Sequence, residues 1–225
     1  MFVAEGPDEY RLIAQPDHAN LSGQVALHWG NDEFDRPNPH HSMVVAAEDH
    51  DHGWATYDLE PHLKADEHKP TGFLEVTSDR WTSFYGDGVD ASTDVDLYGG
   101  LMVSLHASGL RRQGYGVRPE ITDMHKDPGY ADFVEAQEAF QTDVMAEMSD
   151  REEYAEYATE EERAFLREIH ETGEYSGRCR TWYNYHLLQV FDRLSIYYCN
   201  NYSLEETTIG PAPVTYDGEE VALAV

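Results

Sequence analysis

Residues 181–200, TWYNYHLLQVFDRLSIYYCN, form the most aromatic stretch of the chain and carry one acidic residue near their middle. The pattern predicts the longest helix, from about Gly177 to Asn200. Positions three or four residues apart share one face of a helix, and here that face comprises Tyr185, Leu188, Asp192, Ser195 and Cys199. A buried carboxylate is costly unless it is paired or binds a metal, so Asp192 is a candidate site residue.

Five further helices are predicted upstream. The first extends to Gly30, with His18 at the start of its apolar face, and the second contains the apolar run MVVAA and ends at Gly53. Proline favours the first helical turn, and threonine followed three residues later by glutamate forms a capping box. The expected starts, in chain order, are Pro16, Ser42, Asp94, Pro128 and Thr159.

Both ends of the chain have short β patterns instead. Residues 1–14 contain two short apolar runs around Gly6-Pro7-Asp8, and residues 207–225 contain two around Asp217-Gly218. Such turn residues between apolar runs are typical of hairpins. We therefore expect a mainly α fold over residues 1–225, a single domain with a helical core at about 15–200. Its N- and C-terminal segments are expected to share a small antiparallel sheet.

The chain is strongly acidic: 44 Asp and Glu outnumber 15 Lys and Arg, which gives a formal net charge of -29 over 225 residues. The carboxylates are spread along the whole sequence, and only three of the basic residues are lysines. In molar salt the Debye length falls to about 3 Å, which screens the repulsion between such charges. The composition therefore indicates a protein of a salt-adapted cell, although an acidic partner-binding face is an alternative interpretation.

The same charge makes nucleic-acid binding unexpected, because that binding depends on Lys and Arg neutralising phosphates. No apolar run approaches the roughly 18 residues of a membrane helix, and the start of the chain lacks the pattern of a secretory signal. Cys179 and Cys199 are too few for a disulfide framework or a thiolate zinc site. We expect a soluble, cytoplasmic protein without a membrane partner.

Three more polar residues lie on faces that should be buried. His18 leads an apolar helix face, and His50 and Asp51 end the most apolar stretch of the second helix. Imidazole and carboxylate together suit Fe, Mn, Co, Ni or Zn, and several helices can direct such groups to one point. Each residue also has a structural interpretation, because a histidine can pack in a core and Asp192 can pair with Arg11 or Arg193. Asp51 could simply end its helix.

The ordered set, a lone His, then His-Asp, then a distant Asp, resembles the HD-domain superfamily of metal-dependent phosphohydrolases. The segment VVAAEDHDHGW, residues 44–54, resembles that family's apolar helix ending in His-Asp and glycine, and VFDRLSIYY, residues 190–198, resembles its late helix. More narrowly, QPDHANLSGQVA at 15–26, EDHDHGWATYD at 48–58 and DRLSIYYC at 192–199 resemble an uncharacterised family, domain of unknown function 3891.

This resemblance implies an HD-like helical bundle and a divalent metal held by His18, His50, Asp51 and Asp192. Asp51 could bridge to a second ion, for which His106 is the leading ligand and catalytic candidate and His125 and His186 are weaker ones. Many hydrolytic members carry a lysine after the His-Asp segment, but here Trp54 follows Gly53. The missing positive charge could come from Arg193, our catalytic candidate, or from Arg11, Arg111 or Arg112.

Three functions follow as alternatives. The first is hydrolysis of a nucleotide or other small phosphate ester. The second is a di-iron oxygenase on the same scaffold, which needs additional histidines. The third is a non-catalytic, metal-stabilised ligand-binding module, which the missing lysine favours.

Overall fold

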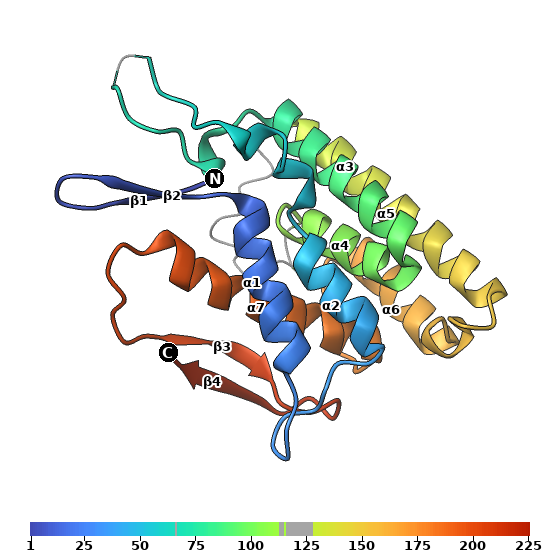
Figure 1. Ribbon diagram of the computed structural model, residues 1–225. Helices are drawn as coiled ribbons and strands as arrows, with labels where there is room; N and C mark the ends of the chain where they lie inside the picture. The colour runs from blue at the N-terminus through green and yellow to red at the C-terminus, as the bar shows by residue number, and fades with distance from the viewer. Residues whose placement is uncertain (66, 113–114, 116–127) are drawn as a thin grey trace.

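The computed structural model describes residues 1–65, 67–112, 115 and 128–225. Within these residues the protein is mainly helical (Figure 1), as the sequence predicts. The helices are α1 Gln15–His28, α2 His40–Asp49, α3 Ser78–Val95, α4 Leu97–Gly109, α5 Pro128–Asp150, α6 Glu160–Thr172 and α7 Arg180–Asn200. Short 3-10 turns cover His52–Trp54, Tyr57–Leu59, Phe73–Glu75 and Ala155–Tyr157.

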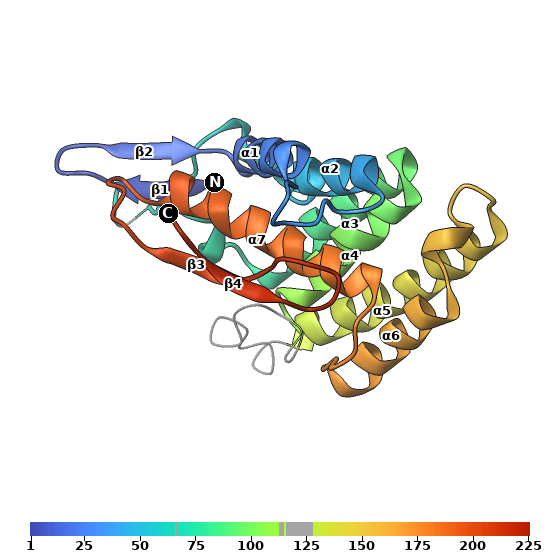
Figure 2. The ribbon, with the colours of Figure 1, turned by 90° about the horizontal axis from the view of Figure 1, so that it is seen from below.

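The strands come from the two ends of the chain, as expected, but they form two separate antiparallel hairpins. Strand β1 (Phe2–Glu5) pairs with β2 (Tyr10–Ile13), and β3 (Thr208–Pro213) pairs with β4 (Glu220–Ala224). Gly6 and Gly218 lie in the two turns, where Gly218 has a φ of 85°. The expectation of one shared sheet is therefore corrected. Both hairpins lie on the same side of the helices (Figures 1 and 2).

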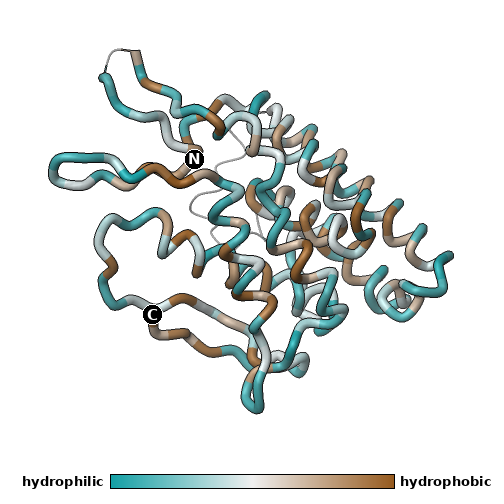
Figure 3. The backbone as a smooth tube through the Cα atoms, in the orientation of Figure 1, coloured by the Kyte–Doolittle hydropathy of each residue, from teal (hydrophilic) through white to brown (hydrophobic). Residues whose placement is uncertain are grey.

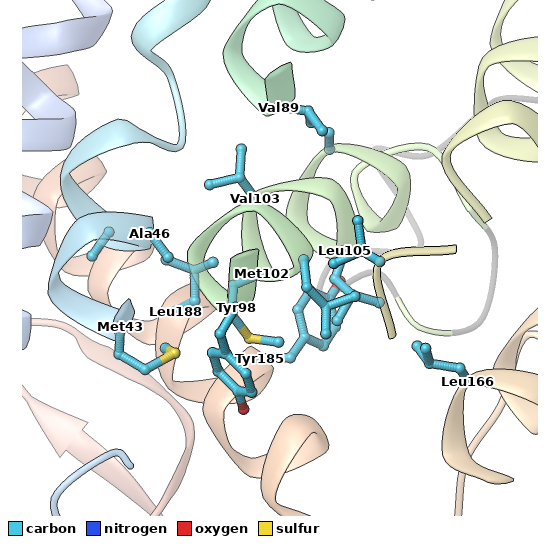
Figure 4. Packing of buried hydrophobic residues seen from close by; sticks show 14 of the residues in the cluster. Met43, Ala46, Val89, Tyr98, Met102, Val103, Leu105, Leu166, Tyr185 and Leu188 are labelled. Atoms are coloured by element: carbon cyan, nitrogen blue, oxygen red, sulfur yellow. The ribbon is translucent and has the colours of Figure 1, made fainter. Parts of the chain in front are cut away.

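Helix α4 is the centre of the core. All 13 of its residues are buried, and a helix that is apolar on every side is stable only when other elements surround it. Helices α2, α3, α5 and α7 pack against α4, and α1 packs against α2 and α7. Figure 4 shows Tyr98 and Met102 of α4 near Met43 of α2 and Leu188 of α7. The ends of α1 and α2 and the middle of α7 thereby meet beside α4.

Helix α3 is the element that the sequence analysis did not predict. Its buried residues Trp81, Tyr85 and Val89 are four apart, which is the spacing of a core-facing helix stripe. Gly86 and Gly88 lie in the interior of this helix, and glycine there is unfavourable by about 0.5–1 kcal/mol relative to alanine. Packing of α3 against α4 and α5 outweighs this low intrinsic propensity.

Gly53 has a different role from the one expected. Helix α2 ends at Asp49 with His50 as its C-cap, so Gly53 does not terminate it. Gly53 lies in the 3-10 turn that packs against α3, where a Cβ atom would come within 1.8 Å of the Phe84 carbonyl oxygen. Only glycine permits this close backbone contact.

Many hydrophilic residues lie at the periphery. Figure 3 shows such residues at the tip of the β1–β2 hairpin and in the loop after α1. Among the described residues, no helix combines the length and the apolar character that a membrane crossing requires.

Candidate metal centre

Three helices bring four polar side chains together inside the protein. His18 lies on α1, His50 and Asp51 follow the last turn of α2, and Asp192 lies in the middle of α7. All four are buried, with exposed fractions of 1%, 1%, 4% and 8% in that order. The sequence predicted these four residues as ligands of a first metal, and His106 as a ligand of a second.

One nitrogen of each imidazole faces one oxygen of each carboxylate. Nε2 of His18 lies 3.0 Å from Nε2 of His50, 3.4 Å from Oδ2 of Asp51 and 3.1 Å from Oδ1 of Asp192. Nε2 of His50 lies 3.7 Å from the same Asp51 oxygen and 3.4 Å from the same Asp192 oxygen. Each imidazole Nε2 therefore lies near an oxygen of both carboxylates, and ligand atoms of His18, His50 and Asp192 lie within 4.8 Å of one another.

These separations fit a bound metal ion. With ligands at about 2.1 Å, neighbouring donor atoms are about 3.0 Å apart in octahedral and about 3.4 Å apart in tetrahedral coordination. The five measured separations run from 3.0 to 3.7 Å. Two imidazole nitrogens and two carboxylate oxygens suit a first-row transition metal or zinc.

The orientation of the His50 ring is set by its own helix. Its Nδ1 lies 2.8 Å from the carbonyl oxygen of Ala47. A carbonyl oxygen can only accept a hydrogen bond, so Nδ1 carries the hydrogen. In the neutral ring Nε2 then presents its lone pair to the cluster, which is the form that a metal requires.

His18 is oriented by a pair of serines between α1 and α7. Its Nδ1 lies 2.6 Å from Oγ of Ser195, whose hydroxyl also contacts Oγ of Ser22 at 2.8 Å and the backbone oxygen of Asp192 at 2.7 Å. Because that backbone oxygen only accepts, Ser195 donates to it and accepts from the Nδ1 hydrogen of His18. The serine thus leaves Nε2 of His18 free to bind a metal.

The charges of the cluster are strongly coupled. Burial alone would lower the pKa of His18, but hydrogen bonding to Asp192 and Asp51 and their negative charges raise it to about 9. Burial would raise the pKa of Asp192, yet hydrogen bonds from His18 and His50 hold it well below its usual range. The two carboxylates therefore stay ionised and require positive charge beside them.

The second carboxylate oxygen of Asp51 makes none of these contacts. Its Oδ1 is fully buried and accepts no hydrogen bond from the residues that the structure describes. An unsatisfied buried carboxylate oxygen is unfavourable, and binding a cation removes that cost. The phenol of Tyr85 on α3 lies beside this carboxylate, and burial together with the charge of Asp51 raises the pKa of Tyr85 well above its usual value.

His106 of α4 lies beside the His50 ring. Its ring centroid is 4.8 Å from that of His50, and burial first, then the charge of His50, lowers its pKa to about 4. Donor atoms of His50, Asp51 and His106 lie within 4.8 Å of one another. His50 has only Nε2 available, however, so it cannot serve two ions. Of these three residues, only Asp51 and His106 could therefore bind a second ion.

The other candidates lie in different surroundings. His186 contacts Trp182 and lies 3.9 Å from Glu220 of β4, and His125 falls outside the described residues. Arg193 donates from Nη1 to the backbone oxygen of Gly210 on β3. Arg11 donates to the backbone oxygen of Asn201, and Arg112 pairs with Glu138 at 3.1 Å.

Tyr85 and the serine pair were not recognised as part of the site from the sequence. The serines had a signal: Ser22 follows His18 by four residues and Ser195 follows Asp192 by three, which places each serine on the same helix face as a candidate ligand. Tyr85 had none, because it belongs to the helix that was not predicted.

The chain was also compared with known proteins. A family model described as "Protein of unknown function (DUF3891)" matches residues 1–222. No curated protein and no solved structure matches the chain.

Proposed function

The chain belongs to the DUF3891 family, and we propose that it is a metal-dependent phosphohydrolase of the HD-domain superfamily. Its substrate is a nucleotide or another small phosphate ester. The observation that carries this proposal is a buried cluster of His18, His50, Asp51 and Asp192. The two Nε2 atoms are 3.0 Å apart, and each lies 3.1 to 3.7 Å from one oxygen of each carboxylate. The order of these residues along the chain is also that of the superfamily.

When bound, a divalent ion would polarise a phosphoryl oxygen and lower the pKa of a water molecule. His18 and His50 would hold it through Nε2, and Asp51 and Asp192 through one oxygen each. Oδ1 of Asp51, which has no hydrogen-bond partner among the described residues, could accept a hydrogen bond from a water molecule beside it. His106, with its pKa lowered to about 4, is neutral near pH 7 and can serve as an additional ligand or as a proton acceptor.

One ion is the arrangement that the ligand geometry supports best. A second ion would share Asp51 and bind His106, and it would need further ligands. The alternative of a di-iron oxygenase requires two irons, so this activity depends on that second site being completed. Elemental analysis of the purified protein distinguishes the hydrolase from the oxygenase. About one ion per chain supports the hydrolase, whereas two irons with oxygen consumption support the oxygenase.

The test of the hydrolase is turnover after loading with Mn, Fe, Co, Ni or Zn, with nucleotides, p-nitrophenyl phosphate and bis-p-nitrophenyl phosphate as substrates. We expect wild type and His28→Ala to bind metal and hydrolyse at least one of them. His28 lies on the same helix as His18 but is exposed, so it is a matched control. His50→Ala should lose both metal and turnover. Absence of turnover with every metal would reject the proposal.

A non-catalytic binding module is the second candidate. Trp54 occupies the place after the His-Asp segment where a phosphate-binding lysine is common, and it is fully buried against Phe84 and Tyr85. Asp192→Ala separates the two functions. An enzyme should lose turnover in this variant, whereas a binding module would have no turnover in wild type and would retain its ligand.

A further inference from the structure

A cavity of about 350 Å³ lies at the start of α7. It is bordered by the segment that connects α6 to α7, by the first two turns of α7 and by the turn between β3 and β4. Strand β3 packs along α7 (Figure 2). None of the four proposed metal ligands lines this cavity. Small-molecule sites are typically cavities of about 300–1,000 Å³ with apolar or aromatic walls and few polar groups, so this one has the size of a ligand site.

The aromatic walls of the cavity are held in place by the rest of the protein. Trp182 packs against Tyr175, with ring centroids 5.7 Å apart, and Tyr183 packs against Tyr216 at 4.1 Å. The hydroxyls of Tyr183 and Tyr216 donate to backbone oxygens of the loop after α1, at 2.8 and 3.2 Å. These rings therefore keep their positions without a ligand, which lowers the entropy lost on binding.

Two side chains of opposite charge border the same cavity. Arg178 and Glu220 are the only Asp, Glu, Lys or Arg residues among its described lining residues. The Arg178 guanidinium lies against Gly218, where a Cβ atom would come within 2.8 Å of Nε. Glu220 does not pair with Arg178; its Oε1 lies 3.9 Å from Nδ1 of His186. Burial lowers the pKa of His186 to about 4, so its ring is neutral near pH 7 and does not neutralise Glu220.

The two charges belong to different ends of the first two turns of α7. Arg178 precedes Cys179, the N-cap residue, whereas Glu220 approaches His186, which follows Cys179 by seven residues. Seven residues of α-helix span about 10 Å. Both aromatic residues that α7 contributes to the walls lie between these ends. The cavity thus presents a cation, an aromatic wall and an anion in this order along α7.

We propose that this cavity binds a small linear zwitterion, a molecule with a carboxylate at one end of an apolar chain and an ammonium group at the other. Arg178 holds the carboxylate, which matches the fork of a guanidinium, and Glu220 holds the ammonium group. The aromatic rings cover the methylene groups and attract the cation. A zwitterion has no net charge, so the formal charge of -29 does not repel it as it repels an anion. Phosphohydrolase activity is not required for this binding.

The probe is ε-aminocaproate, titrated calorimetrically into the full chain. Caproate, hexylamine and glycine are the comparison ligands, because the first two lack one charge and glycine is too short to reach both ends. We expect each of them to bind at least about threefold more weakly than the probe. Arg178→Gln and Glu220→Gln should weaken binding of the probe by a similar factor. The matched controls are Glu219→Gln, which removes the adjacent exposed carboxylate outside the cavity, and Arg151→Gln, which removes an exposed arginine after α5.

A charge swap gives a second measurement. Arg178→Glu and Glu220→Arg should each abolish binding of the probe, whereas the double variant should recover it with the probe reversed. A wild type that does not bind the probe at tens of millimolar, or that binds caproate, hexylamine or glycine equally well, would overturn the proposal without any variant. Wild-type affinity in folded Arg178→Gln or Glu220→Gln would do the same. An affinity that appears only after metal loading would place the probe at the metal centre and also reject the cavity as its site.

Discussion

Replacing Ser195 by alanine should weaken metal binding although Ser195 is not itself a ligand. Its hydroxyl accepts from Nδ1 of His18 at 2.6 Å, contacts Ser22 at 2.8 Å and donates to the backbone oxygen of Asp192 at 2.7 Å. The substitution leaves the His18 ring without the partner that fixes its orientation. It also leaves the Nδ1 hydrogen of His18 in a buried place without an acceptor.

Two effects contribute to the expected magnitude. Removing the partner that orients a metal-bound histidine typically lowers metal affinity about 10- to 100-fold, which is about 1.4 to 2.8 kcal/mol. Leaving buried donors unpaired costs about 1 to 3 kcal/mol of folding stability whether or not metal is present. The first effect is specific to the metal-bound state, so it can be measured separately from the second.

The assay is competition with a chromophoric chelator, alongside urea unfolding of the metal-free protein. Ser92→Ala is the matched control, because Ser92 on α3 is equally buried and its Oγ has no hydrogen-bond partner among the described residues. We expect that variant to keep wild-type metal affinity and to be at least as stable as wild type. If Ser195→Ala and Ser92→Ala bound metal equally well, the orienting role of Ser195 would be refuted.

Three further predictions concern pH, salt and backbone packing. The pKa of His18 is raised from 6.5 to about 9 by Asp192 and Asp51 in spite of burial, so the metal-free protein should lose stability, measured by urea unfolding, as pH rises through this interval. Metal affinity should rise instead, about tenfold per pH unit for one displaced proton, and an affinity independent of pH would contradict this. The thermal midpoint should rise steeply from low salt to 1 M KCl, because the charge of -29 is then screened; a flat response would remove the inference of salt adaptation. Gly53→Ala should destabilise the fold by about 1–3 kcal/mol or more, because the new Cβ meets the Phe84 carbonyl. Gly86→Ala places no atom within 4 Å of the new Cβ and should stabilise α3 by about 0.5–1 kcal/mol. Thermal or urea unfolding measures both changes.

The four proposed metal ligands could be selected from the sequence because each is a local exception. His18 leads an apolar helix face, His50 and Asp51 end an apolar stretch, and Asp192 interrupts one; the resemblance to the HD-domain superfamily then selected these among the 12 histidines. Helix capping was local in part: the Thr159 side chain accepts from the backbone nitrogen of Glu162 as predicted, whereas the Glu162 carboxylate accepts from the backbone nitrogens of Arg180 and Thr181. Features set by a few neighbouring residues are therefore predictable here.

Features that depend on distant segments were not predictable. The strands of each terminal hairpin are joined by their own turn, and no pattern in a short strand specifies whether a remote segment also pairs with it. The requirement for glycine at position 53 arises from the backbone of α3, which begins 25 residues later at Ser78.

The contact between the two imidazoles favours a metal over a purely structural ion pair. Nε2 of His18 and Nε2 of His50 are 3.0 Å apart, so two N–H groups cannot both point into this space. With a single proton between the two nitrogens, the two ionised carboxylates leave the cluster with a net charge of -1. A buried negative charge is costly in a chain that already carries -29. A divalent ion in place of that proton makes the cluster neutral, satisfies both lone pairs at once and provides a partner for the free oxygen of Asp51. For this reason, exchange of that proton for a metal ion should stabilise the fold as well as create the reactive centre.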